Sequence, residues 1–342
     1  MRSPRFKFLA LSLVILGMLY TLPAFLPPYY LYLATEILVY ALFAASVYLL
    51  LGGVGLLSFG QAAFFGIGAY TCAWILKNTE SSFWIAILLG IGLATAAALV
   101  IGFICVRRGK IYFAMLTLAF GQMIFVVIYK WYALTGGEDG ISGVAARPLD
   151  FLFARLDLSN QTNYFFFTAA AAVAGISTLF LIMNSPFGLT LKSIRENQER
   201  VYFTGLNVRR IQTIAFTISG FFAALAGTLL APLTGQVSPD LAHWAKSAEP
   251  VIMILIGGEN YFAGPILGAA FYLFLGRGLH SLTEYWMLVW GCILAVIVLF
   301  SPGGVAGFLS RLLLYLRPSL GGPAGATSRE NPSKKADGPG ES

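Results

Sequence analysis

Stretches of about twenty apolar residues follow one another along most of this chain, separated by short polar segments. A helix that crosses the hydrocarbon layer of a membrane, roughly 30 Å thick, needs about 20 such residues. Of the 342 residues, 58% are hydrophobic and 11% are charged, whereas a soluble domain usually carries roughly 25% charged residues. The sequence therefore predicts an all-α polytopic membrane protein. It excludes a secreted disulfide-stabilised domain, a disordered chain and a fibrous repeat.

The apolar stretches predict about ten membrane spans, within a range of about eight to ten. The first span follows three basic residues, as the core of a signal peptide does, but it is too long for one and lacks a small-residue cleavage site. Two later segments are short and form either two spans or a re-entrant pair. We expect a membrane domain over 1–316 and a disordered tail over 317–342, which is rich in Pro, Gly, Ser and charge. The predicted spans are 8–26, 31–51, 56–76, 83–105, 111–131, 164–183, 211–232, 244–257 (short), 262–276 (short) and 285–300.

The basic residues are distributed unevenly between the two sides of these spans. With the N-terminus inside, the inner segments hold 16 of the 22 Lys and Arg residues and 6 of the 15 acidic residues. Cytoplasmic loops of membrane proteins carry such an excess of Lys and Arg. We therefore predict that both termini are cytoplasmic. The net charge of +7 then reflects orientation in the membrane and attraction to membrane lipid, and we expect no nucleic-acid partner.

Polar chemistry is scarce within the predicted spans. Glu36, Arg277, His280 and Glu284 fall near outer ends of spans. There they either extend to the membrane interface or form a local interfacial ion pair, or they form a substrate or proton site. The two His and three Cys residues lack metal-ligand spacing, and the chain has no phosphate-binding Gly-rich loop of the Gly-x-x-x-x-Gly-Lys-Ser/Thr type. We expect neither an enzyme nor a cofactor or metal bound by this chain. A transporter of this composition takes its energy from separate subunits.

One inner segment, residues 184–210, carries clear helix signals. Ser193 and Glu196 have the spacing of a capping box, which predicts the start of a short helix. Gly205 suits the position that ends this helix, and Asn207 suits the N-cap of the next span. The charges of this helix have both signs, which favours docking of a soluble protein. The alternative is an ordinary basic loop near anionic lipid.

Several motifs in this order resemble the LivM-type permeases of branched-chain amino acid ABC transporters, the LivH/LivM family. They are Ser-Pro-Phe-Gly at 185–188, Ile-Arg-Glu-Asn at 194–197, Gly-Leu-Asn-Val at 205–208, the Gly-rich run at 52–70, Ser-Gly at 219–220, Ala-Gly at 226–227, Gly-Gly at 257–258 and Gly-Pro-Ile-Leu-Gly-Ala at 264–269. The chain departs from the family pattern at Gln198, Val201 and Tyr202, in the turn at 259–261 and after Pro302.

The resemblance implies a type II-like permease of an ABC importer in the bacterial inner membrane. Its partners are then a second, LivH-like permease, two cytoplasmic ATPases that bind ATP and Mg, and a periplasmic solute-binding protein. The helix within 184–210 is then the coupling helix that contacts an ATPase. Its expected coupling residues are Arg195, Glu196, Asn197, Glu199, Arg200, Tyr202, Gly205 and Asn207.

Two further groups of residues are candidates for contact with the substrate and with the binding protein. Polar residues inside spans either line the translocation pathway or pack between helices, and these are Ser58, Gln61, Thr117, Gln122 and Ser219. Acidic residues in the outer loops are either simply solvated or dock the binding protein, and our candidates are Glu138, Asp139 and Glu249.

Other functions remain open from the sequence. A permease of the same superfamily for urea, short amides or another small solute such as a sugar has the same architecture. A stand-alone secondary transporter belongs to a different class, but it usually needs charged groups within the bilayer. A membrane-embedded enzyme needs a catalytic constellation that the sequence does not show.

Overall fold

The computed structural model describes residues 26–80, 82–107, 109–151, 154–282, 285–300 and 304–307, together with residues 17, 21 and 23. The predicted first span, 8–26, lies almost wholly outside the described residues, and Glu284 and the predicted tail over 317–342 lie wholly outside them.

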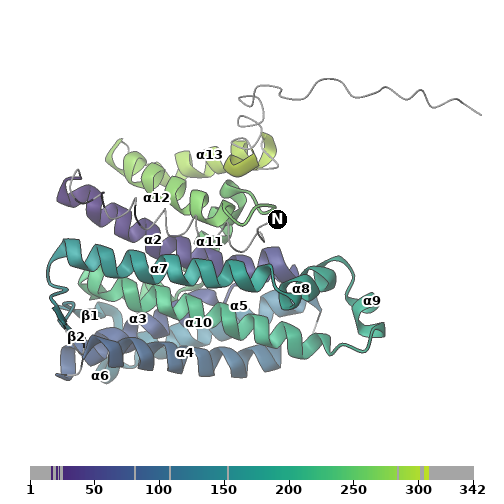
Figure 1. Ribbon diagram of the computed structural model, residues 1–342, viewed down its shortest axis with the longest axis horizontal. Coiled ribbons are helices and arrows are strands. Elements are labelled where there is room, and N and C mark those ends of the chain that lie inside the picture. Colours follow the sequence, from purple (N-terminus) through teal and green to yellow (C-terminus); the bar gives the residue numbers. More distant parts are fainter. Residues whose placement is uncertain are drawn as a thin grey trace, which may run out of the picture.

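The described chain is a bundle of helices with two very small sheets. Figure 1 shows α8 and α9 at one end of the bundle and β1, β2 and α6 at the other, with the long helices running between the two ends. The helices are α2 (Pro28–Tyr48), η2 (Leu49–Val54), α3 (Gln61–Asn78), α4 (Phe83–Cys105), α5 (Lys110–Lys130), α6 (Tyr132–Thr135), η3 (Gly137–Asp139), α7 (Gln161–Met183), α8 (Pro186–Glu196), α9 (Gln198–Phe203), α10 (Val208–Thr234), η4 (Pro239–Ala242), α11 (Trp244–Gly257), α12 (Gly264–Leu282) and α13 (Trp286–Phe300). The strands are β1 (Ile141–Ser142), β2 (Leu149–Phe151), β3 (Ala154–Leu156) and β4 (Gln236–Val237).

Every predicted span from 31–51 onward contains a helix, so the helical prediction is confirmed over the described part of the chain. The predictions 83–105 and 244–257 coincide with α4 and α11 at both ends. Five described helices are long and apolar enough to cross a membrane: Pro28–Val54, Phe83–Cys105, Lys110–Lys130, Gln161–Met183 and Val208–Thr234. The chain is therefore a multi-pass membrane protein.

The predicted start of one span is wrong. Helix α2 continues as the π-helical turn η2, and the chain then runs without helical structure until α3 begins at Gln61, whereas the sequence predicted a helix from residue 56. Gly55 ends η2 with a φ of +73°, a left-handed conformation that glycine adopts readily. Residues 56–60 are mostly apolar or small, so hydropathy alone extends the span across them.

The two small sheets were not predicted. Strand β1 pairs with β4 in antiparallel register, Ile141 opposite Val237, and this pairing joins two loops that the charge distribution placed on the outer side. Both of these side chains are buried. The second sheet is the hairpin of β2 and β3. Two-residue strands carry too few residues for a detectable alternation of apolar and polar positions, so the sequence gives no signal for the first sheet.

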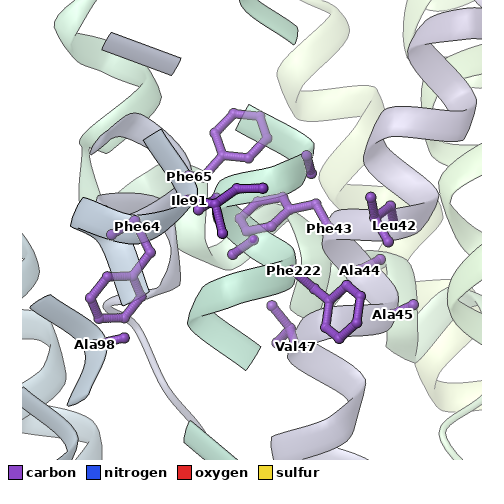
Figure 2. Close-up of a cluster of buried hydrophobic side chains, with 14 of the residues drawn as sticks. Leu42, Phe43, Ala44, Ala45, Val47, Phe64, Phe65, Ile91, Ala98 and Phe222 are labelled. Carbon is purple, nitrogen blue, oxygen red and sulfur yellow. The ribbon is translucent and has the colours of Figure 1, made fainter. Parts of the chain in front are cut away.

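Helix α10 lies at the centre of the bundle and packs against α2, α3 and α4. Figure 2 shows the core that these helices share, in which Phe43 of α2 stacks on Phe65 of α3 with ring centroids 4.6 Å apart. Helices α3 and α10 approach closely because glycines face the opposite backbone. A Cβ atom at Gly227 would collide with the carbonyl oxygen of Phe65. Small residues allow such contacts between membrane helices, where the lipid provides no hydrophobic force for association.

This close contact predicts the effect of a single methyl group. We expect Gly227→Ala to lower the free energy of unfolding by roughly 1–3 kcal/mol, because the new Cβ forces two backbones apart. Gly92→Ala in α4 is the matched control, since its Cβ would have no atom within 4 Å. Unfolding by detergent titration of both variants measures the difference, and equal stability of the two would contradict the close contact.

Candidate functional site

The segment between α7 and α10 folds as two helices with a break at Asn197. Ser185 caps α8 by accepting a hydrogen bond from the Gly188 amide, and Pro186 occupies the first helical position. The prediction that Ser193 starts the helix is therefore wrong. Ser193 lies inside α8, where its hydroxyl donates to the carbonyl oxygen of Leu189 at 3.0 Å. The Ser-Pro pair at 185–186 is the stronger start signal, because it combines a cap with a residue of fixed φ.

The other cap predictions in this segment are confirmed. Gly205 follows the end of α9 with a φ of +83°, and its amide donates to the carbonyl oxygen of Tyr202. Asn207 caps α10, with its side-chain oxygen accepting from the Arg210 amide at 3.1 Å. Asn197 caps α9 in the same way through the Arg200 amide at 2.9 Å. This cap was not predicted, although an Asn just before a charged turn is a common N-cap.

Helix α9 exposes apolar surface at the end of the molecule. Its Val201 is buried, whereas Tyr202 is 69% and Phe203 is 84% exposed. The charged coupling candidates Glu196, Glu199 and Arg200 are exposed as well, and α9 borders an open depression of about 1450 Å³. Figure 1 shows that α9 extends beyond the ends of the long helices. Adjacent exposed aromatic rings with charges at their rim have the composition of a protein docking surface.

Arg195 faces the opposite way, toward the membrane part of the chain. Its guanidinium donates to the carbonyl oxygen of Gly52 at 2.9 Å and to Glu259 Oε1 at 3.3 Å. Its aliphatic stem covers Gly55, where an added Cβ would lie 2.9 Å from Arg195 Cγ. We call these contacts the Arg195 link. They join α8 to η2 and to the turn between α11 and α12, three segments that the charge distribution placed on the inner side.

Aromatic contacts reinforce the same junction. Phe262, in the turn between α11 and α12, packs edge-to-face on Tyr48 of α2 and on Phe180 of α7, with ring centroids 5.9 and 5.2 Å apart. Leu191 and Ile194 are buried on the inner face of α8. The turn that Arg195 reaches through Glu259 is thus also in contact with α2 and α7 through Phe262.

The predicted pathway residues are mainly buried around the non-helical stretch between η2 and α3. Thr117 Oγ1 accepts from the Phe59 amide at 3.3 Å, and Ser58 Oγ accepts from the Gly60 amide at 3.4 Å. Ser247 of α11, which the sequence analysis did not name, accepts from the Ala62 amide at 2.9 Å. These hydroxyls accept hydrogen bonds from backbone amides that have no carbonyl partner within a helix.

The remaining pathway candidates have different surroundings. Ser219 is buried and donates to the carbonyl oxygen of Ser46 at 2.7 Å, which ties α10 to α2. Within the described part of the chain, the buried side-chain amide of Gln61 has no hydrogen-bond partner at either Nε2 or Oε1, and neither does Gln122 Oε1. An unpartnered buried amide is costly unless a solvent or ligand molecule reaches it. Gln61 is therefore the pathway candidate that the geometry favours, and the assignment of all five stays a prediction.

At the opposite end, two ion pairs join charged residues of the helices. Arg277 of α12 pairs with Glu36 of α2, and Lys246 pairs with Glu249 within α11 at 2.9 Å. Lys246 also lies 4.8 Å from the centre of the Tyr40 ring. The interfacial ion pair is thus the alternative that the structure supports for Glu36 and Arg277.

The predicted docking residues at this end divide into two kinds. Glu138 and Asp139 are exposed on η3, where a docking protein has access to them. The Glu249 side chain is only 22% exposed and is engaged by Lys246. Docking by any of the three stays a prediction, and the pairing of Glu249 makes it the weakest of them.

The comparisons with known proteins agree with the motifs. The family described as "branched-chain amino acid transport system / permease component" matches residues 29–300. The permease LivM of Escherichia coli K12 is 29% identical over 87% of this chain and 73% of that protein, and LivM of Salmonella typhimurium is 28% identical over 84% and 71%. LivH of Salmonella typhimurium is 25% identical over 78% of this chain and 91% of that protein. No solved structure matches the chain. The chain therefore belongs to the family of permease components of branched-chain amino acid transport systems.

Proposed function

We propose that this chain is one permease subunit of a bacterial ABC importer for branched-chain amino acids. A second, LivH-like permease completes the pathway, and the chain is similar to both LivM and LivH relatives. Two cytoplasmic ATPases bind ATP and Mg and provide the energy, and a periplasmic solute-binding protein delivers the amino acid. The chain itself carries no catalytic step.

The observation that carries this proposal is the shape of the segment 184–210. It presents the exposed aromatic pair of α9 outward, while the Arg195 link holds its other side to two membrane elements, η2 and the turn between α11 and α12. A movement imposed on α9 by an ATPase then displaces η2 and the α11–α12 turn. An ordinary basic loop has no capped helices and no such fixed connections.

The proposed orientation places this segment in the cytoplasm, with both termini on the same side, in the inner membrane. The excess of Lys and Arg in the inner segments supports it. The pairing of β1 with β4 supports it too, because it places both predicted outer loops at the far end of the bundle. The proposed architecture is a type II-like permease in which 8–26 and the nine helical segments that follow make ten spans.

The proposed substrates are apolar amino acids, and the binding protein supplies the selectivity. A zwitterion bound tightly inside a membrane needs charged partners, and four charged residues of the described spans are already engaged with each other, in the pairs Glu36–Arg277 and Lys246–Glu249. The permease then offers a weakly binding, mostly apolar passage in which Gln61 is the leading polar contact.

The direct test is uptake into proteoliposomes that hold the four-subunit complex. We expect leucine, isoleucine and valine to accumulate only when ATP and the binding protein are both present. Urea and acetamide serve as the alternative substrates. Accumulation of those two but not of leucine would identify a permease for small amides, and accumulation driven by an ion gradient without ATP would identify a secondary transporter.

The aromatic pair of α9 generates a prediction on ATPase binding. We expect Tyr202→Ser combined with Phe203→Ser to weaken ATPase association about 30-fold, because buried aromatic contacts at interfaces are typically worth about 2 kcal/mol or more. Both side chains are exposed, so folding is preserved. Tyr132→Ser, at an equally exposed tyrosine at the other end of the bundle, is the control. Unchanged association of the α9 variant in a pull-down assay would exclude α9 as the docking helix.

The Arg195 link generates a second prediction, which separates coupling from docking. Arg195→Met keeps an aliphatic stem over Gly55 but removes both hydrogen bonds, so we expect the ATPases to bind normally while amino-acid uptake falls about tenfold. Glu259→Gln keeps an acceptor for Arg195 and should reduce uptake less. Loss of ATPase binding in Arg195→Met would show instead that Arg195 contacts the ATPase itself.

A further inference from the structure

A basic groove lies between the end of α4 and the start of α10, beside the coupling segment. Its volume is about 360 Å³. The described residues that line it include three arginines and no acid. They are Phe103, Val106, Arg107, Asn207, Arg209, Arg210, Thr213 and Ile214.

The three arginines have no ion-pair partner among the described residues. The described ion pairs are Arg195–Glu259, Lys246–Glu249 and Arg277–Glu36, and the side chains of Arg209 and Arg210 are exposed. Arg107 lies over the ring of Phe103, with its guanidinium carbon 4.2 Å from the ring centre. Three like charges that line one groove repel each other unless an anion lies between them.

The groove is also bordered by the amino end of α10. The first amides of a helix and its dipole both favour an anion, and the Asn207 cap occupies one of these amides, that of Arg210. The positive end of the helix therefore adds to the field of the three arginines. All of these groups favour the same occupant, an anion.

One side of the groove opens onto exposed apolar surface. Phe103 of α4 is 58% exposed and Ile214 of α10 is 48% exposed, and both line the groove. The exposed surface of α4 continues away from the groove through Val100 and Leu99. An occupant that satisfies both surfaces has an anionic head and apolar chains.

We propose that this groove binds the phosphate headgroup of an anionic phospholipid, with its acyl chains lying along α4. A protein ligand is less suitable, because the neighbouring α9 surface carries both acids and bases whereas the groove carries only cations. Basic pockets at the cytoplasmic ends of membrane helices are typical sites for anionic lipid.

The position of the groove gives the lipid a consequence for coupling, and this step rests on the proposed function. Only residues 204–207 separate α9 from α10. A lipid that fixes the start of α10 at the membrane surface therefore fixes one end of the segment on which the ATPase acts. Uptake should then depend on anionic lipid, whereas ATPase binding should not.

The test measures lipid binding by the full-length permease in detergent, using native mass spectrometry without ATPases or binding protein. We expect phosphatidylglycerol to bind in preference to phosphatidylcholine. The variant Arg107→Gln/Arg209→Gln/Arg210→Gln should bind phosphatidylglycerol about 100-fold more weakly, since each basic residue near a membrane surface is worth about 1 kcal/mol. Because no transport is measured, this result does not depend on the proposed function.

A control variant removes the same charge elsewhere. Lys77→Gln/Lys110→Gln/Lys192→Gln lies outside the groove lining and should keep the lipid preference. An equal loss of phosphatidylglycerol affinity in both variants would show that the net charge of the chain, and not the groove, attracts the lipid. That result would overturn the proposal. Phe103→Ala keeps all three arginines but removes the apolar wall of the groove. We expect it to weaken the binding of phosphatidylglycerol.

Two further arms identify the source of the anion. Competition by inorganic phosphate at millimolar concentration, with no dependence on acyl chains, would identify a free-phosphate site and overturn the lipid assignment. Retained lipid binding by the triple arginine variant together with lost ATPase association would assign the groove to the protein partner. In proteoliposomes, we expect phosphatidylglycerol added to phosphatidylcholine to raise uptake by the wild-type complex but not by this variant.

Discussion

A membrane-spanning chain depends on finding a hydrogen-bond partner for every backbone amide and carbonyl that is shielded from water. Helices satisfy this condition by themselves, but the stretch between η2 and α3 does not. Within this stretch the amides of Phe59 and Gly60 donate to Thr117 and Ser58. On either side of it, the Ala62 amide in the first turn of α3 donates to Ser247, and Arg195 donates to the carbonyl oxygen of Gly52 in η2. These donors and acceptors come from α5, α8 and α11 as well as from the stretch itself. The interruption of one helix therefore fixes the positions of three others.

This dependence also connects the segment 184–210, the proposed coupling segment, to the membrane helices. Arg195 bonds the carbonyl oxygen of Gly52 in η2, just before the interrupted stretch, and the same guanidinium pairs with Glu259. A surface ion pair of this exposure, 35% and 40% for the two side chains, contributes little stability by itself. Its importance is positional, because it keeps α8 aligned with the two breaks in the bundle, at 55–60 and at 258–263. Breaks in helices are the places where a packed bundle changes shape most easily.

The sequence predicted the helices well and the interruptions poorly, for a physical reason. Hydropathy measures how apolar a residue is, so it located α4 and α11 at both ends but continued a span across the apolar residues at 56–60. The signal that was present, a glycine run ending in Gly55, was interpreted as a loop between spans. Pairings such as Glu36 with Arg277, which are 241 residues apart, leave no trace in a local pattern. Caps are local, and those at Gly205 and Asn207 were predicted correctly.

The two ends of the bundle use their charges differently, and this difference bears on function. At the end with β1 and β4, two described ion pairs join charged residues of the helices, Glu36–Arg277 and Lys246–Glu249. At the end with α8 and α9, Arg107, Arg209 and Arg210 have no described counterion, and Tyr202 and Phe203 have no covering surface. Like charges gathered along one groove and adjacent exposed aromatic rings are typical of surfaces that another molecule covers. Both proposed contacts therefore fall at the end with α8 and α9: an anionic lipid on one side of α10, and an ATPase at α9.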